Sequence, residues 1–243
     1  MNGFCRYELR TTDVEAAREF YRDLLGDEFW GHGIEIGSLP AHAAARGAPP
    51  HWLGHIGVDD VVGAVYRFLD AGATLLGRRT GRDGASQVVD TSNSVVRDPS
   101  GALVALTSAR PNAVDAIDAV GSVAWHLLTA RDEAQAFAVY SDLFGWERVE
   151  TFDLGRDRGR HVTFTWEAGG AAVGSTSNIA RLPHVHAQWL FFFRTENLAE
   201  SLAAVRGLGG LTLPPTETAD GDLVAACDDP QGAAFGLYQR RRH

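Results

Sequence analysis

The chain has 243 residues, of which 45% are hydrophobic and 22% are charged, a composition that can bury a sizeable core and excludes a disordered chain. Its formal net charge is −9 and its sequence pI is about 5.4, which argues against nucleic-acid binding because nucleic-acid-binding proteins normally carry a basic face. No apolar run reaches the ~18 residues of a membrane span, and the first residues lack the pattern of a signal peptide. We therefore expect a globular cytoplasmic protein with no nucleic-acid or membrane partner.

The two cysteines and the single basic run of the sequence are interpreted as structural features and not as functional ones. Cys5 and Cys227 are too few for a disulfide framework, so we expect two reduced, packed thiols, as is usual in the cytoplasm. Arg240–Arg242 is the only basic run in the chain, and its position predicts a solvated tail.

The first predicted elements are a strand and a helix. Residues 4–10 alternate between apolar and charged side chains, as a half-buried strand does. Thr12 with Glu15 three residues later predicts a capping box, and Gly26 ends the helix. A weak strand is expected near 34–36, followed by a loop rich in Ala and Pro.

A second strand and helix follow the loop. The stretch 51–58 predicts a strand, Asp59 and Asp60 cap a helix, and Gly72 ends it. Three more strands are expected at 73–76, 87–90 and 102–107.

The pattern restarts after a predicted linker at 110–120. Residues 122–145 repeat 3–26 with an offset of 119, which superposes Tyr7 on His126 and Tyr21 on Tyr140. A third module then has a strand at 122–129, a helix capped by Asp132, and strands at 147–152, 161–166 and 171–174. A fourth has a strand at 188–194, a helix from Asn197 to about Arg206, and strands at 211–213, 223–227 and 233–239. The sequence thus predicts an α+β fold of four βαβββ modules in two tandem halves, 1–112 and 113–243.

The repeated motifs resemble those of a known superfamily. Two of them occur twice: a helix carrying an aromatic residue and Tyr followed by Leu-Gly or Phe-Gly, and a closing Asp-Pro-x-Gly-Ala at 98–102 and 229–233. They are similar to the vicinal oxygen chelate superfamily, which includes glyoxalase I, extradiol dioxygenases and bleomycin-binding proteins, and to its tandem two-domain glyoxalase-like members. The resemblance implies that each half is a curved mixed sheet around a cleft, with helices outside.

The resemblance also implies where metal ligands should stand. Metal-using members carry a His or Glu on the first strand of a module, a His before the second helix and a Glu on the last strand. The corresponding positions here are Arg6, Leu53 and Ala105 in the first half and Trp125, Leu190 and Gly236 in the second. None of these side chains is a usual ligand of a divalent cation. We therefore expect no metal site, and no cofactor, in either half.

Other side chains are expected to line the cleft. Arg6 and Glu8 share a strand face with Arg10, which indicates either a solvated face or a charged lip that binds a carboxylate or phenolate. Trp125, Leu127, Phe192 and Trp166 form an apolar and aromatic lining suited to a planar molecule. His55 is the histidine expected to contact a ligand, and Glu8 and His55 are the candidate catalytic bases. His126 is expected to be a packed, hydrogen-bonded histidine.

These features favour a metal-free protein that binds a planar or aromatic metabolite or antibiotic. The alternative is an enzyme of the superfamily: a lyase, isomerase or dioxygenase that uses a divalent metal, or a metal-free enzyme with Glu8 or His55 as base. A third hypothesis is a scaffold used for protein contacts. The tandem halves are compatible with either a monomer or a homodimer.

Overall fold

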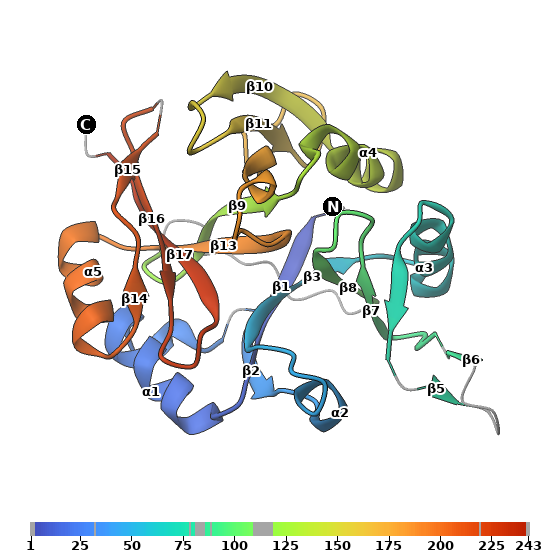
Figure 1. Cartoon of the computed structure of the whole chain (residues 1–243), viewed down its shortest axis with the longest axis horizontal. Helices are drawn as coiled ribbons and strands as arrows, with labels where there is room; N and C mark the ends of the chain where they lie inside the picture. The colour runs from blue at the N-terminus through green and yellow to red at the C-terminus, as the bar shows by residue number, and fades with distance from the viewer. Residues whose placement is uncertain are drawn as a thin grey trace. The chain divides into compact units, whose positions relative to one another are not determined.

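The computed structural model describes residues 3–31, 33–77, 79–80, 86–87, 89–108, 119–218 and 220–241. Within these ranges, five α-helices and two large mixed sheets give the predicted α+β fold (Figure 1). Most of the predicted linker at 110–120 lies outside the described residues. None of the described helices combines the length and the apolar character that crossing a membrane requires.

Strands from the first half of the sequence form a six-stranded sheet with the order β2-β1-β3-β8-β7-β4. Their bounds are β1 Phe4–Thr11, β2 Ile34–Ser38, β3 His51–Gly57, β4 Thr74–Leu76, β7 Asn93–Arg97 and β8 Leu103–Thr107. A separate pair consists of β5 Arg79–Thr80 and β6 Ser86–Gln87. β1 pairs with β2 and β3 pairs with β8 in parallel, whereas β7 is antiparallel to both of its neighbours. Among the described residues, the first module has one strand after its helix where the βαβββ pattern predicts three.

Strands from the second half form a nine-stranded sheet with the order β10-β11-β12-β9-β13-β17-β16-β14, and β15 pairs with β16. Their bounds are β9 Val123–Thr129, β10 Glu147–Asp153, β11 Arg160–Thr165, β12 Gly174–Ser177, β13 Gln188–Arg194, β14 Leu211–Thr212, β15 Thr216–Glu217, β16 Leu223–Asp228 and β17 Ala234–Gln239. The parallel pairing of β13 with β17 sets Phe192 beside Gly236, as the pairing of β3 with β8 sets His55 beside Ala105. The two sheets therefore share their central pairing.

The helices are α1 Val14–Leu25, α2 Ala41–Ala44, α3 Val61–Asp70, α4 Glu133–Phe144 and α5 Leu198–Gly207. The predicted caps Asp60, Asp132 and Asn197 are confirmed, because each side chain accepts a backbone N–H from the first turn. The predicted capping box at Thr12 is wrong by one residue. The carboxylate of Asp13 accepts the N–H of Ala16 instead, and a carboxylate at a helix N-terminus also interacts favourably with the helix dipole.

Two predicted strands are displaced. Of the described residues in the strand expected at 87–90, only Gln87 lies in a strand, β6, because the Asp90 carboxylate accepts N–H groups from the residues that follow and forms a turn. The strand lies beyond this turn, in β7. The strand expected at 171–174 begins only at its last residue, and β12 continues to Ser177. β12 has the sequence Gly-Ser-Thr-Ser and is buried throughout, so it offers no hydrophobic alternation to recognise.

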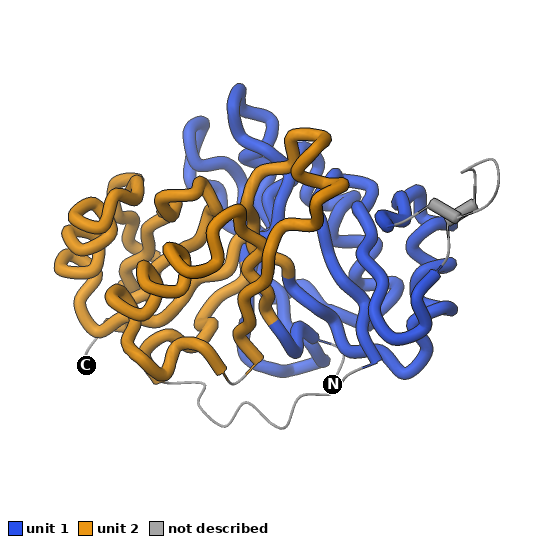
Figure 2. The backbone as a smooth tube through the Cα atoms, turned by 90° about the horizontal axis from the view of Figure 1, so that it is seen from below, with its two compact units in different colours: residues 1–6, 54–111, 127–189 blue, residues 7–53, 112–126, 190–243 orange. Residues whose placement is uncertain are grey.

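The chain forms two compact units (Figure 2). Unit 1 consists of Met1–Arg6, Gly54–Pro111 and Leu127–Trp189, and unit 2 consists of Tyr7–Leu53, Asn112–His126 and Leu190–His243. Each unit takes segments from both predicted halves, whereas each large sheet takes its strands from one half. Accordingly, α3 packs against α4 in unit 1, and α1 packs against α5 in unit 2.

Each unit has an aromatic core. In unit 1, the Trp146 ring stacks on Phe164 with centroids 5.2 Å apart, and on Tyr140 at 5.1 Å. In unit 2, Tyr21 stacks on Phe29 with centroids 5.4 Å apart. All five rings are buried, so both clusters remove aromatic surface from water.

Candidate functional site

The repeated motifs meet in a buried hydrogen-bonded triad in unit 1. The Tyr140 hydroxyl on α4 donates to Asp98 Oδ2 at 2.8 Å and accepts from Trp189 Nε1 at 2.9 Å. The other oxygen of Asp98 accepts the backbone N–H groups of the Asp-Pro-x-Gly turn. Burial, and then the nearby charge of Asp98, raise the pKa of Tyr140 well above 10. The tyrosine therefore stays a neutral donor.

Unit 2 contains an equivalent triad. Tyr21 donates to Asp229 Oδ2 at 3.3 Å and accepts from Trp52 Nε1 at 2.9 Å. Burial is the main cause that raises the pKa of Tyr21 well above 10, and burial also raises the pKa of Asp229. The Tyr, Trp and Asp-Pro-x-Gly residues that identify the repeat thus hold the cores together, with no reactive group exposed.

The place expected for a first metal ligand holds an arginine bonded to a histidine. In unit 1, Arg6 Nη2 on β1 lies 2.8 Å from His55 Nδ1 on β3. A guanidinium only donates, so His55 Nδ1 accepts, and the imidazole proton is on Nε2. Ala105 on β8 lies beside His55 in the sheet register. A histidine whose Nδ1 accepts from a cation and an alanine side chain with no donor atom do not fit a divalent cation.

His55 is fully buried, whereas Arg6 is partly exposed. Of these two side chains, Arg6 is therefore the one that is accessible to a ligand. His55 accepts a hydrogen bond from its guanidinium. Leu53, two residues before His55 on β3, is also fully buried and has no donor atom. Among the described residues, no three His, Cys, Asp or Glu side chains come close enough to hold a metal ion.

Glu8, the other candidate base, lies in unit 2. Its carboxylate accepts from Arg10 Nε at 3.1 Å, and both side chains are about one-fifth exposed, at 20% and 19%. Glu35 on β2 stands beside Glu8 in the parallel register. The Glu8 carboxylate is therefore already engaged by the Arg10 guanidinium.

The second-half positions carry apolar groups in unit 2. A Cβ added to Gly236 would overlap the Phe192 ring, so this ring covers the backbone where the superfamily expects a carboxylate. Leu190 is buried and Trp125 is partly exposed. None of these side chains offers a metal a lone pair in the required geometry.

The remaining predicted residues have structural surroundings. Tyr7 Oη lies 2.6 Å from His126 Nε2, which confirms the expectation of a packed, hydrogen-bonded histidine. Trp166, in unit 1, packs against Trp146 with centroids 4.4 Å apart and belongs to the aromatic core more than to a binding surface. Leu127 is partly exposed on β9.

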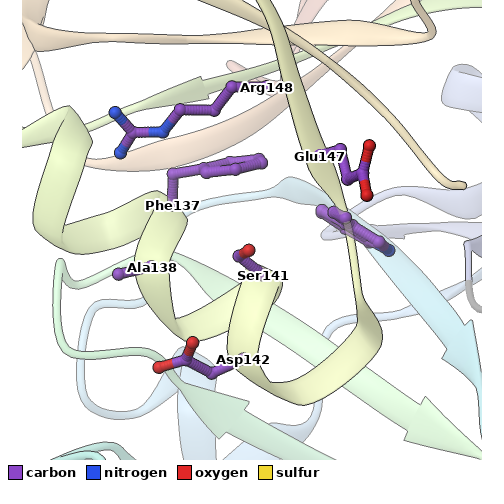
Figure 3. A pocket seen from close by; sticks show the side chains of 7 residues that line it. Phe137, Ala138, Ser141, Asp142, Glu147 and Arg148 are labelled. Carbon is purple, nitrogen blue, oxygen red and sulfur yellow. The ribbon is translucent and has the colours of Figure 1, made fainter. Parts of the chain in front are cut away.

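Sequence reasoning did not find a surface hollow of about 470 Å³ in unit 1 (Figure 3). It lies between α4 and the start of β10 and is lined by Phe137, Ala138, Ser141, Asp142, Trp146, Glu147 and Arg148. Arg148 is engaged within it, because its guanidinium lies 5.3 Å from the Phe137 ring centroid and donates to the Ala134 carbonyl. This hollow involves none of the predicted site residues, and most of its lining lies in the repeated helix motif, which signals the fold and not a site.

The two mixed sheets and the two triads are consistent with glyoxalase-like βαβββ modules. Residues 120–237 match the family model of the Glyoxalase/Bleomycin resistance protein/Dioxygenase superfamily, which confirms the recognition from the motifs. The chain is 26% identical to the mycobacterial "Putative glyoxylase CFP32" from Mycobacterium bovis, over 96% of this chain and 92% of that protein.

Several solved structures with a similar fold are dioxygenases. The 2,3-dioxygenase LapB from Pseudomonas sp. KL28 superposes with a TM-score of 0.61 at 15% identity, covering 100% of this chain and 94% of that one. A complex of homoprotocatechuate 2,3-dioxygenase from Brevibacterium fuscum with 3,4-dihydroxyphenylacetate has a TM-score of 0.62 at 13% identity, covering 98% and 80%. At this identity the likeness concerns the fold alone.

Proposed function

We propose that the chain binds a small planar organic anion without a metal ion, and that Arg6 is the residue that recognises its acidic group. The observation that carries the proposal is the bond between Arg6 and His55 at the position where a metal ligand is expected. A buried, neutral imidazole holds the guanidinium in place, so less side-chain entropy is lost when an anion binds.

The chemistry of an arginine suits a carboxylate or phenolate. A guanidinium presents a planar set of donors that can bind two oxygens at once, and it keeps its charge at any physiological pH. The two candidate bases support binding more than catalysis, because His55 Nδ1 accepts from Arg6 and Glu8 accepts from Arg10. The similar proteins are named as a glyoxylase and as a dioxygenase. The experiment below therefore also tests the alternative that this chain is an enzyme.

A cytoplasmic location is part of the same proposal. Neither Cys5 nor Cys227 forms a disulfide, which is what a reducing compartment maintains. A monomer and a homodimer both remain compatible with it.

The test measures metal content and ligand binding on the same purified protein. We expect less than stoichiometric Zn, Ni, Mn and Fe by elemental analysis, and no change in melting temperature with EDTA. We expect salicylate and benzoate to raise the melting temperature, as binding to the native state requires, and neutral benzamide to raise it much less.

The matched variants are Arg6→Gln and Arg22→Gln, which remove the same charge from β1 and from an exposed position on α1. Arg6→Gln should weaken salicylate binding at least tenfold, whereas Arg22→Gln should leave it unchanged. Stoichiometric metal whose removal by chelator abolishes an activity would overturn the proposal, and so would equal salicylate binding by both variants.

A further inference from the structure

A second hollow, of about 360 Å³, lies in unit 2 and has a cationic lining. The residues around it come from three separate segments of the chain: Ala119, Val120, Arg194, Thr195, Glu196, Arg240 and Arg241. Three arginines and one glutamate give this lining a formal charge of +3 − 1 = +2, in a chain whose net charge is −9. Two of the arginines belong to the run that the sequence predicts to be a solvated tail. They are exposed, as predicted, but they line a defined concave surface.

Backbone hydrogen bonds fix the first two segments against each other. Gly121 N donates to Arg194 O at 2.9 Å, and Arg194 N donates to Ser122 O at 2.8 Å. Thr195 N in turn donates to Tyr238 O at 2.8 Å, which joins the end of β13 to the end of β17. The positions from which Arg194 and the C-terminal arginines extend are therefore set by the sheet.

The C-terminal segment is held in a similar way. Arg241 N donates to Asp222 Oδ1 at 2.7 Å, and Tyr238 Oη bonds the other oxygen of the same carboxylate. The Arg241 side chain lies against Gly221, where an added Cβ would come within 2.9 Å of it. Gly221 has φ = +83°, a conformation that favours glycine, so this close approach depends on the residue at that position.

From this geometry we infer that the hollow binds a small ligand through a group with several acidic oxygens, either a phosphoryl group or a pair of carboxylates. Arginines are suited to such groups because their forked donors match the oxygen geometry. None of the described residues that line the hollow carries an aromatic ring, so the charged group and not a planar ring is what they recognise. The volume lies at the lower end of the range of ligand pockets, which suits a small anion. This site is separate from Arg6 and does not depend on the function proposed for it.

The test is isothermal titration of the full chain with pyrophosphate and, in a second arm, with succinate, at constant ionic strength. Fixed ionic strength keeps electrostatic screening constant during the titration, so that a saturable isotherm reports a site. A preference for pyrophosphate indicates a phosphoryl ligand, and a preference for succinate indicates a dicarboxylate; either result supports the inference. Failure of both probes to give a saturable isotherm would overturn it.

The matched variants are Arg240→Gln/Arg241→Gln and Arg22→Gln/Arg46→Gln. Each pair removes two exposed arginines and changes the net charge equally, and the backbone bond of residue 241 to Asp222 is kept. Binding of the preferred probe should weaken at least tenfold in the first pair and less than twofold in the second. Equal weakening in both pairs would show a general effect of charge and would contradict the inference. Arg6→Gln should leave this binding unchanged, which separates the present test from that of the proposed function.

Discussion

The two compact units carry the same buried triad but hold it with different strength. In unit 1, Tyr140 donates to Asp98 at 2.8 Å, and the Ser100 hydroxyl donates to the same carboxylate at 2.6 Å. In unit 2, the bond from Tyr21 to Asp229 is longer, at 3.3 Å, and no hydroxyl at the position equivalent to Ser100 assists it, because that residue is Gln231. Equivalent positions of the predicted repeat thus form the same hydrogen bonds, but the bond lengths and the number of donors to the carboxylate differ.

The strand faces differ far more than the triads do. The first-half positions expected for metal ligands include Arg6 and fully buried Ala105, and the second-half equivalents are Trp125 and Gly236. One face carries charge, and the other is apolar, with Phe192 lying over the glycine. The triads are alike because a buried polar group needs a hydrogen-bond partner, and this requirement restricts which residues can stand there. The side chains on the strand faces have no such requirement, and their chemistry differs between the two halves.

The largest expected effect comes from removing a triad carboxylate. Asp98→Ala should lower the free energy of unfolding by about 3 kcal/mol or more, because several buried donors lose their acceptor at once. Asp229→Ala should cost less, since its bond to Tyr21 is weaker. Urea denaturation followed by tryptophan fluorescence measures both.

Asp90→Ala is the matched control for Asp98→Ala. Asp90 accepts N–H groups in a similar turn but is exposed, so those donors return to water, and the cost should stay below about 1 kcal/mol. An equal cost for Asp90→Ala and Asp98→Ala would show that the turn, and not the buried triad, determines the effect.

The next effect tests the apolar face. Gly236→Ala should destabilise the protein by about 1–3 kcal/mol, because the new Cβ overlaps the Phe192 ring and the ring must shift. In a Phe192→Ala background the same change should cost little, and this double-mutant cycle isolates the contact. A cost that is the same in both backgrounds would mean that the backbone, not the ring, resists the added methyl group.

A smaller effect distinguishes the two carboxylates at pH 7. Burial raises the pKa of Asp229, so its charged form costs stability, and that cost grows as the pH rises through its folded pKa. Asp229→Asn relieves this cost and keeps an oxygen for the turn. Asp98→Asn should therefore destabilise more than Asp229→Asn, by about 1 kcal/mol. The opposite order in parallel urea denaturation experiments would contradict the comparison of the triads.

The smallest expected effect concerns acid stability and His161 in unit 1. Burial lowers the pKa of His161 below its ordinary value of 6.5. The unfolded chain therefore takes up the proton first, and stability falls as the pH decreases from 6.5 through the folded pKa, with no effect above 6.5. His161→Gln should reduce this slope in melting temperature between about pH 7 and pH 5. His42→Gln, at an exposed histidine of α2, is the control, and an equal reduction there would contradict the assignment.

The sequence predicted the elements better than the contacts. Caps such as Asp132 and Asn197 are local signals, and with Asp60 they placed three helices correctly. β12 could not be predicted, because small polar residues that are buried carry no periodic signal. The bond from Arg6 to His55 joins residues 49 positions apart, and the cationic hollow joins three distant segments. Such contacts depend on strand register and turns, which composition does not report.

The bond between Tyr7 and His126 has a consequence for how such a chain can be assembled. Tyr7 and His126 occupy equivalent positions of the predicted repeat, so two equivalent positions form a hydrogen bond with each other. In a symmetric pair of identical half-length chains, tyrosine would face tyrosine or histidine would face histidine at this point. The mixed pair needs one copy of each half, and the tandem chain supplies both halves in one polypeptide.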